Sequence, residues 1–351
     1  MNMSLNKPKQ IVKHPAWIMG LLSLLLLFSG TASSREIVDM AGRKVSVPDR
    51  ITKVYAAQPY TYVLMSAVAP ERLIGLPGPL SDSEKRFVKP ELASLPVLGN
   101  GMGPGKQVNI ESVLALHPDI VLMKGDPKTN TQAAEKFTKL GIPVVFVDLA
   151  RIENYPDGIE FTAKLLDKRE RGHKLGSYSR RVLAKVKRFT ATIPSNKRVK
   201  VYYAESADGL TTECDQSFHA DAIKMAGGAI VHHCQLSRHI GMEKVSLEQI
   251  LAYNPDVIVA SDRNFADNVK NDPRWRHVRA VANRRIYTVP RTPFNWIDRP
   301  PSVTRIMGIQ WLANRFYPDR YRINLRATTR EFQRLFFGVE LLDAELDVLL
   351  N

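Results

Sequence analysis

The residues with the richest chemistry lie in one stretch of the chain, between positions 211 and 239. Both cysteines are here, Cys214 and Cys234, and so are four of the eight histidines, namely His219, His232, His233 and His239. Thiolate and imidazole groups are ligands that suit late first-row metals such as nickel, cobalt, copper and zinc. The stretch 213–239 therefore predicts a divalent-metal site, with His219, His232 and His233 as its candidate ligands.

The two cysteines have alternative roles. In an oxidising compartment, cysteines 20 positions apart most often form a disulfide, and free thiols or metal-bound thiolates are the alternatives. Neither a CxxC nor an HExxH spacing occurs in the chain, and metal ligation by the sulfur atoms would be expected to show such spacing. A disulfide between Cys214 and Cys234 would still permit ligation by histidine, because it would hold two loops together beside His219.

The N-terminus predicts export. Residues 1–32 combine three lysines, an apolar run of 13 residues at 16–28 and small residues at 30–32, which is the pattern of a cleavable signal peptide. The run is too short to span a bilayer comfortably, so an uncleaved anchor is the weaker alternative. Cleavage after Ala32 would lower the formal net charge from +15 to +12. The remaining basic residues are scattered without interleaved aromatic residues, so we expect no nucleic-acid partner.

A repeated unit organises the mature chain. Segments 108–121 and 245–258 align without a gap at an offset of 137 residues, with the same proline and aspartate at the end of a short helical pattern. Between them, residues 167–192 predict a long helix with an apolar stripe and a highly charged opposite face. The chain thus divides into a signal peptide (1–32), an N-terminal lobe (33–166), a linker helix (167–192) and a C-terminal lobe with a helical tail (193–351).

Short apolar strands alternate with helices in both lobes, which predicts an α/β fold with a Rossmann-like parallel sheet in each lobe. Ligands of such folds bind at the carboxyl ends of the strands, here in a cleft between the lobes. We expect helices at 61–68, 111–116, 131–140, 220–226, 275–282 and 302–316, a helical tail over 329–350, and strands at 44–47, 51–56, 72–75, 120–123, 143–148, 198–204, 257–260 and 285–289.

The order of several motifs resembles the periplasmic binding proteins of ABC importers for iron–siderophore, haem and cobalamin. The motifs are DMAGRKVSVP at 39–48, NIESVLALHPDIV at 109–121, AGG at 226–228, VSLEQILAYNPDVI at 245–258 and IYTVP at 286–290. The resemblance implies two lobes joined by one long helix, a monomer, and a periplasmic protein that delivers a metal chelate to an inner-membrane permease and its ATPase. It also implies acidic permease-docking residues on the two lobes, for which Glu91 and Glu243 are the candidates.

Candidate ligand-binding residues follow from position after a predicted strand or in a glycine-rich loop. Tyrosine and tryptophan offer flat faces to a chelate, and arginine offers charged hydrogen bonds to its carboxylates or catecholates. The set is Gln58, Tyr60, Met102, Lys124, Arg263, Arg291, Asn295, Trp296 and Arg299.

Sequence motifs distinguish between the alternative functions of the protein. The sequence has no GxSxG, P-loop or HExxH motif, so we expect neither an enzyme nor a catalytic cofactor. The alternative interpretation as an exported metallochaperone is supported only by the cysteine–histidine stretch. Within the importer interpretation, the ligand is an iron chelate or, alternatively, nickel, cobalt or zinc, bare or weakly chelated.

Overall fold

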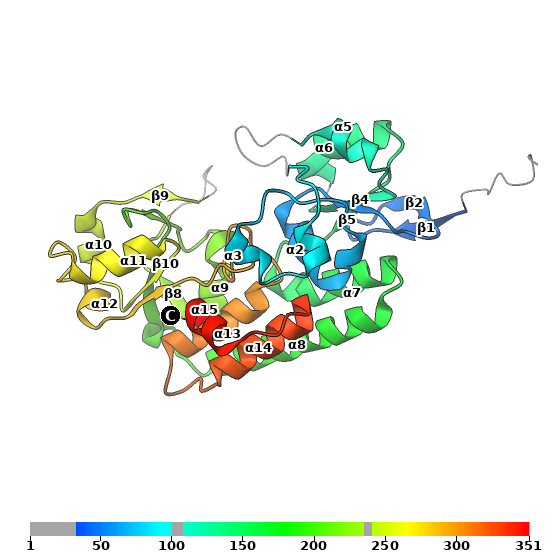
Figure 1. Ribbon diagram of the computed structural model, residues 1–351. Helices are drawn as coiled ribbons and strands as arrows, with labels where there is room; N and C mark the ends of the chain where they lie inside the picture. Colours follow the sequence, from blue (N-terminus) through cyan, green and yellow to red (C-terminus); the bar gives the residue numbers. More distant parts are fainter. Residues whose placement is uncertain (1–32, 100–107, 126, 235–240, 351) are drawn as a thin grey trace, which may run out of the picture.

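The computed structural model describes residues 33–99, 108–125, 127–234 and 241–350, and it consists of two α/β lobes side by side (Figure 1). The N-terminal lobe contains a parallel sheet in the order β3 (Val54–Ala56), β4 (Ile120–Lys124) and β5 (Val144–Val147). A hairpin of β1 (Ser34–Val38) and β2 (Lys44–Pro48) precedes this sheet. The strands of the sheet are short runs of mainly aliphatic residues, buried on both faces as parallel strands between helices must be.

The C-terminal lobe contains a four-stranded parallel sheet. Its order is β11 (Ile286–Thr288), β10 (Val257–Ala260), β6 (Val199–Ala204) and β8 (Gly228–Ile230). A two-residue ribbon of β7 (Thr211–Thr212) and β9 (Glu243–Lys244) lies beside it. The α/β class and the two Rossmann-like lobes are confirmed, whereas β8 and the ribbon were not predicted.

The repeat has the same structure in both lobes. Helix α5 (Ile110–Ala115) leads into β4, and helix α10 (Leu247–Tyr253) leads into β10. The side chain of Asn109 or Ser246 accepts a hydrogen bond from the third residue of its helix, which caps the free amide. The aligned residues His117 and Asn254 both adopt left-handed backbone conformations, with φ of 50° and 42°. The two copies therefore share their turns as well as their helices.

Helix α8 (Arg169–Ala191) connects the lobes and buries the predicted apolar stripe, including Leu175 and Val186. It packs closely on α7 (Tyr155–Leu165), where a Cβ at Gly172 would lie 2.4 Å from the Cβ of Ala163. The guanidinium of Arg171 donates to the carbonyl of Ala67 at the end of α2 (Pro59–Val68), and to a carbonyl of the C-terminal helices. The connecting helix is thus fixed to elements on both sides.

The predicted helical tail over 329–350 consists of two helices, α14 (Leu325–Phe337) and α15 (Asp343–Leu350). Gly338 ends α14 in a left-handed conformation, with φ of 68°, which glycine adopts without steric cost. Figure 1 shows α14 alongside α8 and α13 (Arg305–Phe316). In α15, Leu346 and Leu349 pack with Phe87 of the N-terminal lobe. The tail therefore bridges the two lobes.

The remaining elements are short. The helix predicted over 275–282 is wrong in its first half, because residues 275–278 form turns and only α12 (Arg279–Ala282) is helical. The other α-helices are α3 (Asp82–Lys85), α4 (Pro90–Ala93), α6 (Pro127–Lys139), α9 (Asp221–Met225) and α11 (Arg263–Asn268). The 3₁₀ turns are η2 (Pro70–Arg72), η3 (Ile152–Asn154), η4 (Ser195–Lys197), η5 (Phe218–Ala220) and η6 (Val269–Asn271).

One hydrophobic cluster extends through both lobes. It contains Val145 of the first sheet, Leu175 of the connecting helix and Val201 of the second sheet, together with Trp311 of α13. The lobes thus share a core in addition to their covalent connection. Within the described part of the chain, no helix has the length and apolarity that crossing a membrane would require.

Candidate functional site

A lysine between two aromatic rings marks the place where the lobes face each other. Lys124 ends β4, and its Nζ lies 4.2 Å from the ring centroid of Tyr60 in the first turn of α2. The same Nζ lies 5.5 Å from the ring centroid of Phe218, which belongs to the C-terminal lobe. Burial lowers the pKa of Lys124, and the nearby Arg305 guanidinium lowers it further, whereas Asp148 and Asp298 oppose the shift. Among the described residues, no carboxylate lies within ion-pair distance of Lys124.

Gln58 fixes the positions of Lys124 and Tyr60 through its side-chain amide. Its Oε1 accepts a hydrogen bond of 2.7 Å from the backbone N–H of Lys124, and its Nε2 donates to Asn130 over 3.0 Å. Both ends of the amide are thereby occupied. Gln58 joins the end of β4 to the start of α2, and this contact fixes where Lys124 and Tyr60 meet.

The opposite wall contains a buried histidine–aspartate pair. His219 Nδ1 lies 2.7 and 2.8 Å from the two carboxylate oxygens of Asp298. Arg305 of α13, itself buried, donates to the carbonyl of Phe218 at 3.0 Å and approaches Asp298 at 3.4 Å. Because Asp298 accepts at Nδ1, the nitrogen of His219 left for a ligand is Nε2.

Next to this pair, Arg299 forms ion pairs with two buried acids. Its guanidinium lies 2.7 Å from Glu205 and 2.5 Å from Glu213, whose side chains are 1% and 0% exposed. Burial raises the pKa of Glu205 to about 8; the Glu213 carboxyl adds to the rise and Arg299 opposes it. Glu213 Oε1 also accepts from the N–H of Met242, while its Oε2 has no partner among the described residues.

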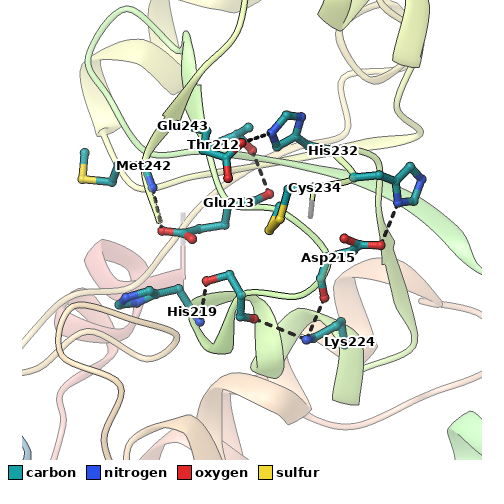
Figure 2. The surroundings of a disulfide bond; sticks show 12 residues. Thr212, Glu213, Asp215, His219, Lys224, His232, Cys234, Met242 and Glu243 are labelled. Carbon is teal, nitrogen blue, oxygen red and sulfur yellow. Dashed lines mark hydrogen bonds and ion pairs between the residues drawn. A yellow bond between two sulfur atoms is a disulfide. The ribbon is translucent and has the colours of Figure 1, made fainter. Parts of the chain in front are cut away.

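The two cysteines form a disulfide. Figure 2 shows this bond between Cys214, which follows the ribbon strand β7, and Cys234, which follows β8. A second connection joins the same segments, because the N–H of Asp215 donates to the carbonyl of His232 over 2.9 Å. The sequence left three roles open for the two cysteines, and the structure shows the disulfide. The sulfur atoms are therefore not available as thiolate ligands.

The structure does not bring the three candidate histidines together. His232 has both ring nitrogens engaged, Nε2 at 2.7 Å from Glu243 and Nδ1 at 3.0 Å from the Tyr253 hydroxyl. The His233 side chain is 76% exposed and pairs with Asp215. The groups of three possible metal ligands found in the described residues are Glu213, His219 and Asp298, and Cys214, Cys234 and Glu243. Neither group contains His232 or His233, and the second contains the disulfide.

The remaining candidates that the structure describes are buried or bonded to other groups. Trp296 is fully buried under α13, and Asn295 is buried with its side chain accepting from the N–H groups of Ile297 and Asp298. Arg291 donates to the carbonyl of Ser261. Arg263 begins α11 and approaches a carbonyl of α15. Met102 lies outside the described residues.

The docking candidates are on opposite lobes. Glu91 is exposed on α4, and Glu243 lies on β9 with its carboxylate bonded to His232.

Sequence reasoning missed four residues of the site, Glu205, Phe218, Asp298 and Arg305. Glu205 and Asp298 follow strands of the C-terminal sheet, which is a signal that sequence alone contains. Their pairing with Arg299 and His219 joins positions 94 and 79 residues apart, and only the fold reveals it.

A groove of about 580 Å³ is lined by both lobes, and Lys124, Phe218 and Arg299 are not among its lining residues. Pro59 and Tyr62 line it from α2, and Pro293, Phe294 and Pro300 line it from the segment that also contains Arg299. Its volume lies within the range of about 300–1,000 Å³ typical of small-molecule sites. The cationic groups and this mostly apolar groove are thus separate features between the lobes, adjacent in sequence at Pro59–Tyr60 and at Arg299–Pro300.

The profile of a family described as periplasmic binding protein matches residues 84–293, more than half of the chain. The chain belongs to this family. The binding protein is 27% identical to the molybdate-binding protein MolA of Haemophilus influenzae, over 93% of this chain and 97% of the relative. It is 23% identical to the vitamin B12-binding protein of Vibrio parahaemolyticus, over 80% of this chain and 90% of the relative.

Comparison with solved structures gives the same family. An ABC transporter solute-binding protein from Sulfurospirillum deleyianum is 34% identical, with a TM-score of 0.84 over 90% of this chain and 98% of that one. Molybdate-bound MolA is 24% identical in its structural alignment, with a TM-score of 0.69 over 88% and 99%, and shares the fold. The predicted resemblance is confirmed, and the protein is the substrate-binding component of an ABC transporter. The family implies a periplasmic location, and its members are solute-binding proteins.

Proposed function

We propose that this protein captures a small, metal-containing anion in the cleft between its lobes and delivers it to an inner-membrane permease. The observation that supports this most is Lys124. Its ammonium group is partly desolvated between Tyr60 and Phe218 and has no carboxylate partner among the described residues. A cation removed from water without a counter-ion is costly, and an anionic ligand would provide the missing charge.

The groups around Lys124 suit an oxyanion. Lysine and the Arg299 guanidinium offer charge-assisted N–H donors, and these are the strong hydrogen bonds that oxyanions receive in proteins. Together with the similarity to a molybdate-binding protein, these donors favour a tetrahedral metal oxyanion such as molybdate as the first candidate ligand.

A small ferric chelate is the second candidate. The exposed parts of Tyr60 and Phe218 offer aromatic faces at the cleft, and an anionic chelate would use the same cations. A relative from Bacillus subtilis, 23% identical over 78% of this chain, is an Fe(3+)-citrate-binding protein. A bare divalent metal loses its main support, because the disulfide occupies both sulfur atoms and Glu243 and Tyr253 occupy His232.

The test is isothermal titration calorimetry of the mature protein with sodium molybdate, tungstate and sulfate, then ferric citrate and haem, then nickel, cobalt and zinc salts. We expect molybdate or ferric citrate to bind, and Lys124→Met to weaken binding by at least about tenfold, which is about 1.4 kcal/mol. Lys136→Met, an exposed lysine on α6, is the matched control. Binding of a divalent salt with no response to any anion would refute the proposal.

Delivery requires contact with the permease. We retain Glu91 and Glu243 as docking candidates, one on each lobe. Glu91 is exposed, while the Glu243 side chain is 25% exposed and bonded to His232, so Glu91 is the stronger of the two. Charge reversal at each position, with uptake measured in cells and ligand affinity measured on the purified protein, separates docking from binding.

A further inference from the structure

Two sulfur atoms and a carboxylate lie close together next to the ribbon of β7 and β9. The Sγ atoms of Cys214 and Cys234 and one carboxylate oxygen of Glu243 are all within 4.8 Å of one another. Figure 2 shows Glu243 and His232 beside the disulfide. Cys214 is buried, whereas Cys234 and Glu243 are partly exposed, so one edge of the group faces solvent. Thiolates and carboxylates are both ligands of zinc.

His232 orients the carboxylate of this group. Its Nε2 lies 2.7 Å from Glu243 Oε2, and its Nδ1 lies 3.0 Å from the Tyr253 hydroxyl. Carboxylates that bind metals are themselves held by hydrogen bonds of this kind, and the supporting groups contribute to the affinity for the metal. The Glu243 side chain is thus held in place by a group that is not needed as a metal ligand.

Backbone pairing places the three ligands independently of the sulfur–sulfur bond. Thr212, two residues before Cys214, is opposite Glu243 in the antiparallel ribbon. The N–H of Asp215 donates to the carbonyl of His232 over 2.9 Å, and this contact joins the segments that contain the two cysteines. Reduction of the disulfide leaves both contacts in place. The two thiols and the carboxylate should therefore stay near one another in the reduced protein.

We propose that Cys214, Cys234 and Glu243 form a zinc site when the disulfide is reduced, with a water molecule as the fourth ligand. Three protein ligands and one water are a common coordination of zinc, and the two thiolates favour zinc over magnesium or calcium. The inference goes beyond the proposed function and does not depend on it, because none of the three residues belongs to the group around Lys124.

A dithiol supplies the two electrons that the reduction requires. One thiolate of the dithiol attacks the sulfur of Cys234, because Cys214 is only 2% exposed, and the bond between the two cysteines breaks. The second thiolate of the dithiol then breaks the mixed disulfide, and the reagent leaves as a cyclic disulfide. Both cysteines are now thiols. Zinc forms a bond to each sulfur, and the two thiol protons pass to water.

The two redox states would hold the same segments by different bonds. In the oxidised protein the disulfide joins the segment after β7 to the segment after β8, and in the reduced protein zinc would join them. Glu213, which forms an ion pair with Arg299, immediately precedes Cys214. Zinc should therefore keep Glu213 beside Arg299 when a dithiol has opened the disulfide.

The experiment compares the oxidised and reduced forms of the mature protein. The reduced form is prepared with dithiothreitol, freed of the reagent by gel filtration without oxygen, and titrated with zinc chloride by calorimetry. Cobalt chloride, followed by absorption, reports thiolate ligation through sulfur-to-cobalt charge transfer in the near ultraviolet. We expect about one zinc ion per reduced chain, and neither this zinc binding nor the cobalt band in the oxidised form.

Two variants test the ligand set. His232→Leu should weaken zinc binding by the reduced protein by about 10–100-fold, as for other groups that support a metal ligand. Glu243→Gln should weaken it at least as much, because the charged ligand itself is lost. Glu248→Gln, an exposed glutamate on α10, is the matched control and should bind as the wild type does.

Several results would overturn the site. Equal zinc affinity of the oxidised and reduced forms would place the metal away from the sulfur atoms. Wild-type affinity in both Glu243→Gln and His232→Leu would remove the carboxylate from the ligand set. If circular dichroism shows that reduction unfolds the lobe, zinc should restore the native spectrum, and failure to do so would also overturn the proposal. Titration of the oxidised protein with molybdate or ferric citrate tests the proposed function separately.

Discussion

Asp298 fixes the imidazole of His219 through a contact of 2.7 Å to Nδ1, and the two side chains are only 0% and 6% exposed. A carboxylate in this position sets both the tautomer and the ring orientation of the histidine, as it does in many metal and catalytic sites. The remaining nitrogen, Nε2, is the one that a ligand would meet. Arg305 holds the carboxylate from the other side.

Asp298→Asn should weaken binding and destabilise the fold. The amide cannot balance the buried Arg305 charge, and breaking a buried pair in this way costs about 3–5 kcal/mol. We expect molybdate or ferric citrate affinity to fall by about 10–100-fold, as for lost supporting contacts at other histidine ligands. Calorimetry and urea unfolding measure the two effects. Asp267→Asn, at an exposed ion pair with Lys270, should change neither.

Replacing both cysteines should destabilise the C-terminal lobe. The disulfide closes a loop of 20 residues, and cross-links of this length contribute about 2–4 kcal/mol. The Cys214→Ser, Cys234→Ser double variant should therefore unfold at lower urea concentration. Because Cys214 follows Glu213 directly, the variant should also bind the anion more weakly. Unchanged unfolding would show that the hydrogen bond between Asp215 and His232 already holds the two segments.

Glu205 should also make stability depend on pH. Its pKa rises on folding, from the ordinary 4.5 to about 8, so the folded state binds more protons between these values. Its contribution is therefore fully present below about pH 4.5 and is lost progressively as the pH rises to about 8. Glu205→Gln should remove this decline and should melt above the wild type at pH 9. Thermal denaturation at several pH values measures it, with Glu153→Gln as control; parallel curves for all three proteins would contradict it.

The bridge between the lobes can be tested with two leucines of the tail. Leu346 is fully buried in the cluster with Phe87, whereas Leu342 is 69% exposed. Leu346→Ala should cost about 2–5 kcal/mol, the usual range for a buried leucine, and Leu342→Ala should cost little. Amide hydrogen exchange of α3 and α4 should become faster only in the first variant. Equal effects of the two changes would mean that the cluster does not hold the N-terminal lobe.

The sequence was informative where local pattern and repetition determine structure. The repeat located α5, β4, α10 and β10, because cap, helix, proline and buried strand recur in the same order. Strand β8 was missed, since Gly228 and Ala229 give no strand signal and its pairing with β6 is set by the rest of the sheet. A helical tail was predicted, but its division at Gly338 was not, because the helical pattern continues past that residue.

The site was only partly predictable for a similar reason. Position after a strand identified Lys124 and Arg299, and cysteine–histidine chemistry identified His219. The same rule selected Trp296, which the packing of α13 buries. Burial and partners decide whether a residue after a strand faces the cleft, and both depend on contacts distant in sequence. The acid pair that holds Arg299 could not be inferred before β6 and β7 were placed side by side.

The hydrophobic cluster that runs through both lobes has a consequence for transport kinetics. Separating the lobes would expose apolar surface, at about 2.5 kcal/mol for each 100 Å². The empty protein should therefore keep nearly the same shape as the loaded one and present nearly the same face to the permease. Empty and loaded molecules would then compete for the same transporter. A large excess of the binding protein over its ligand should slow uptake rather than accelerate it.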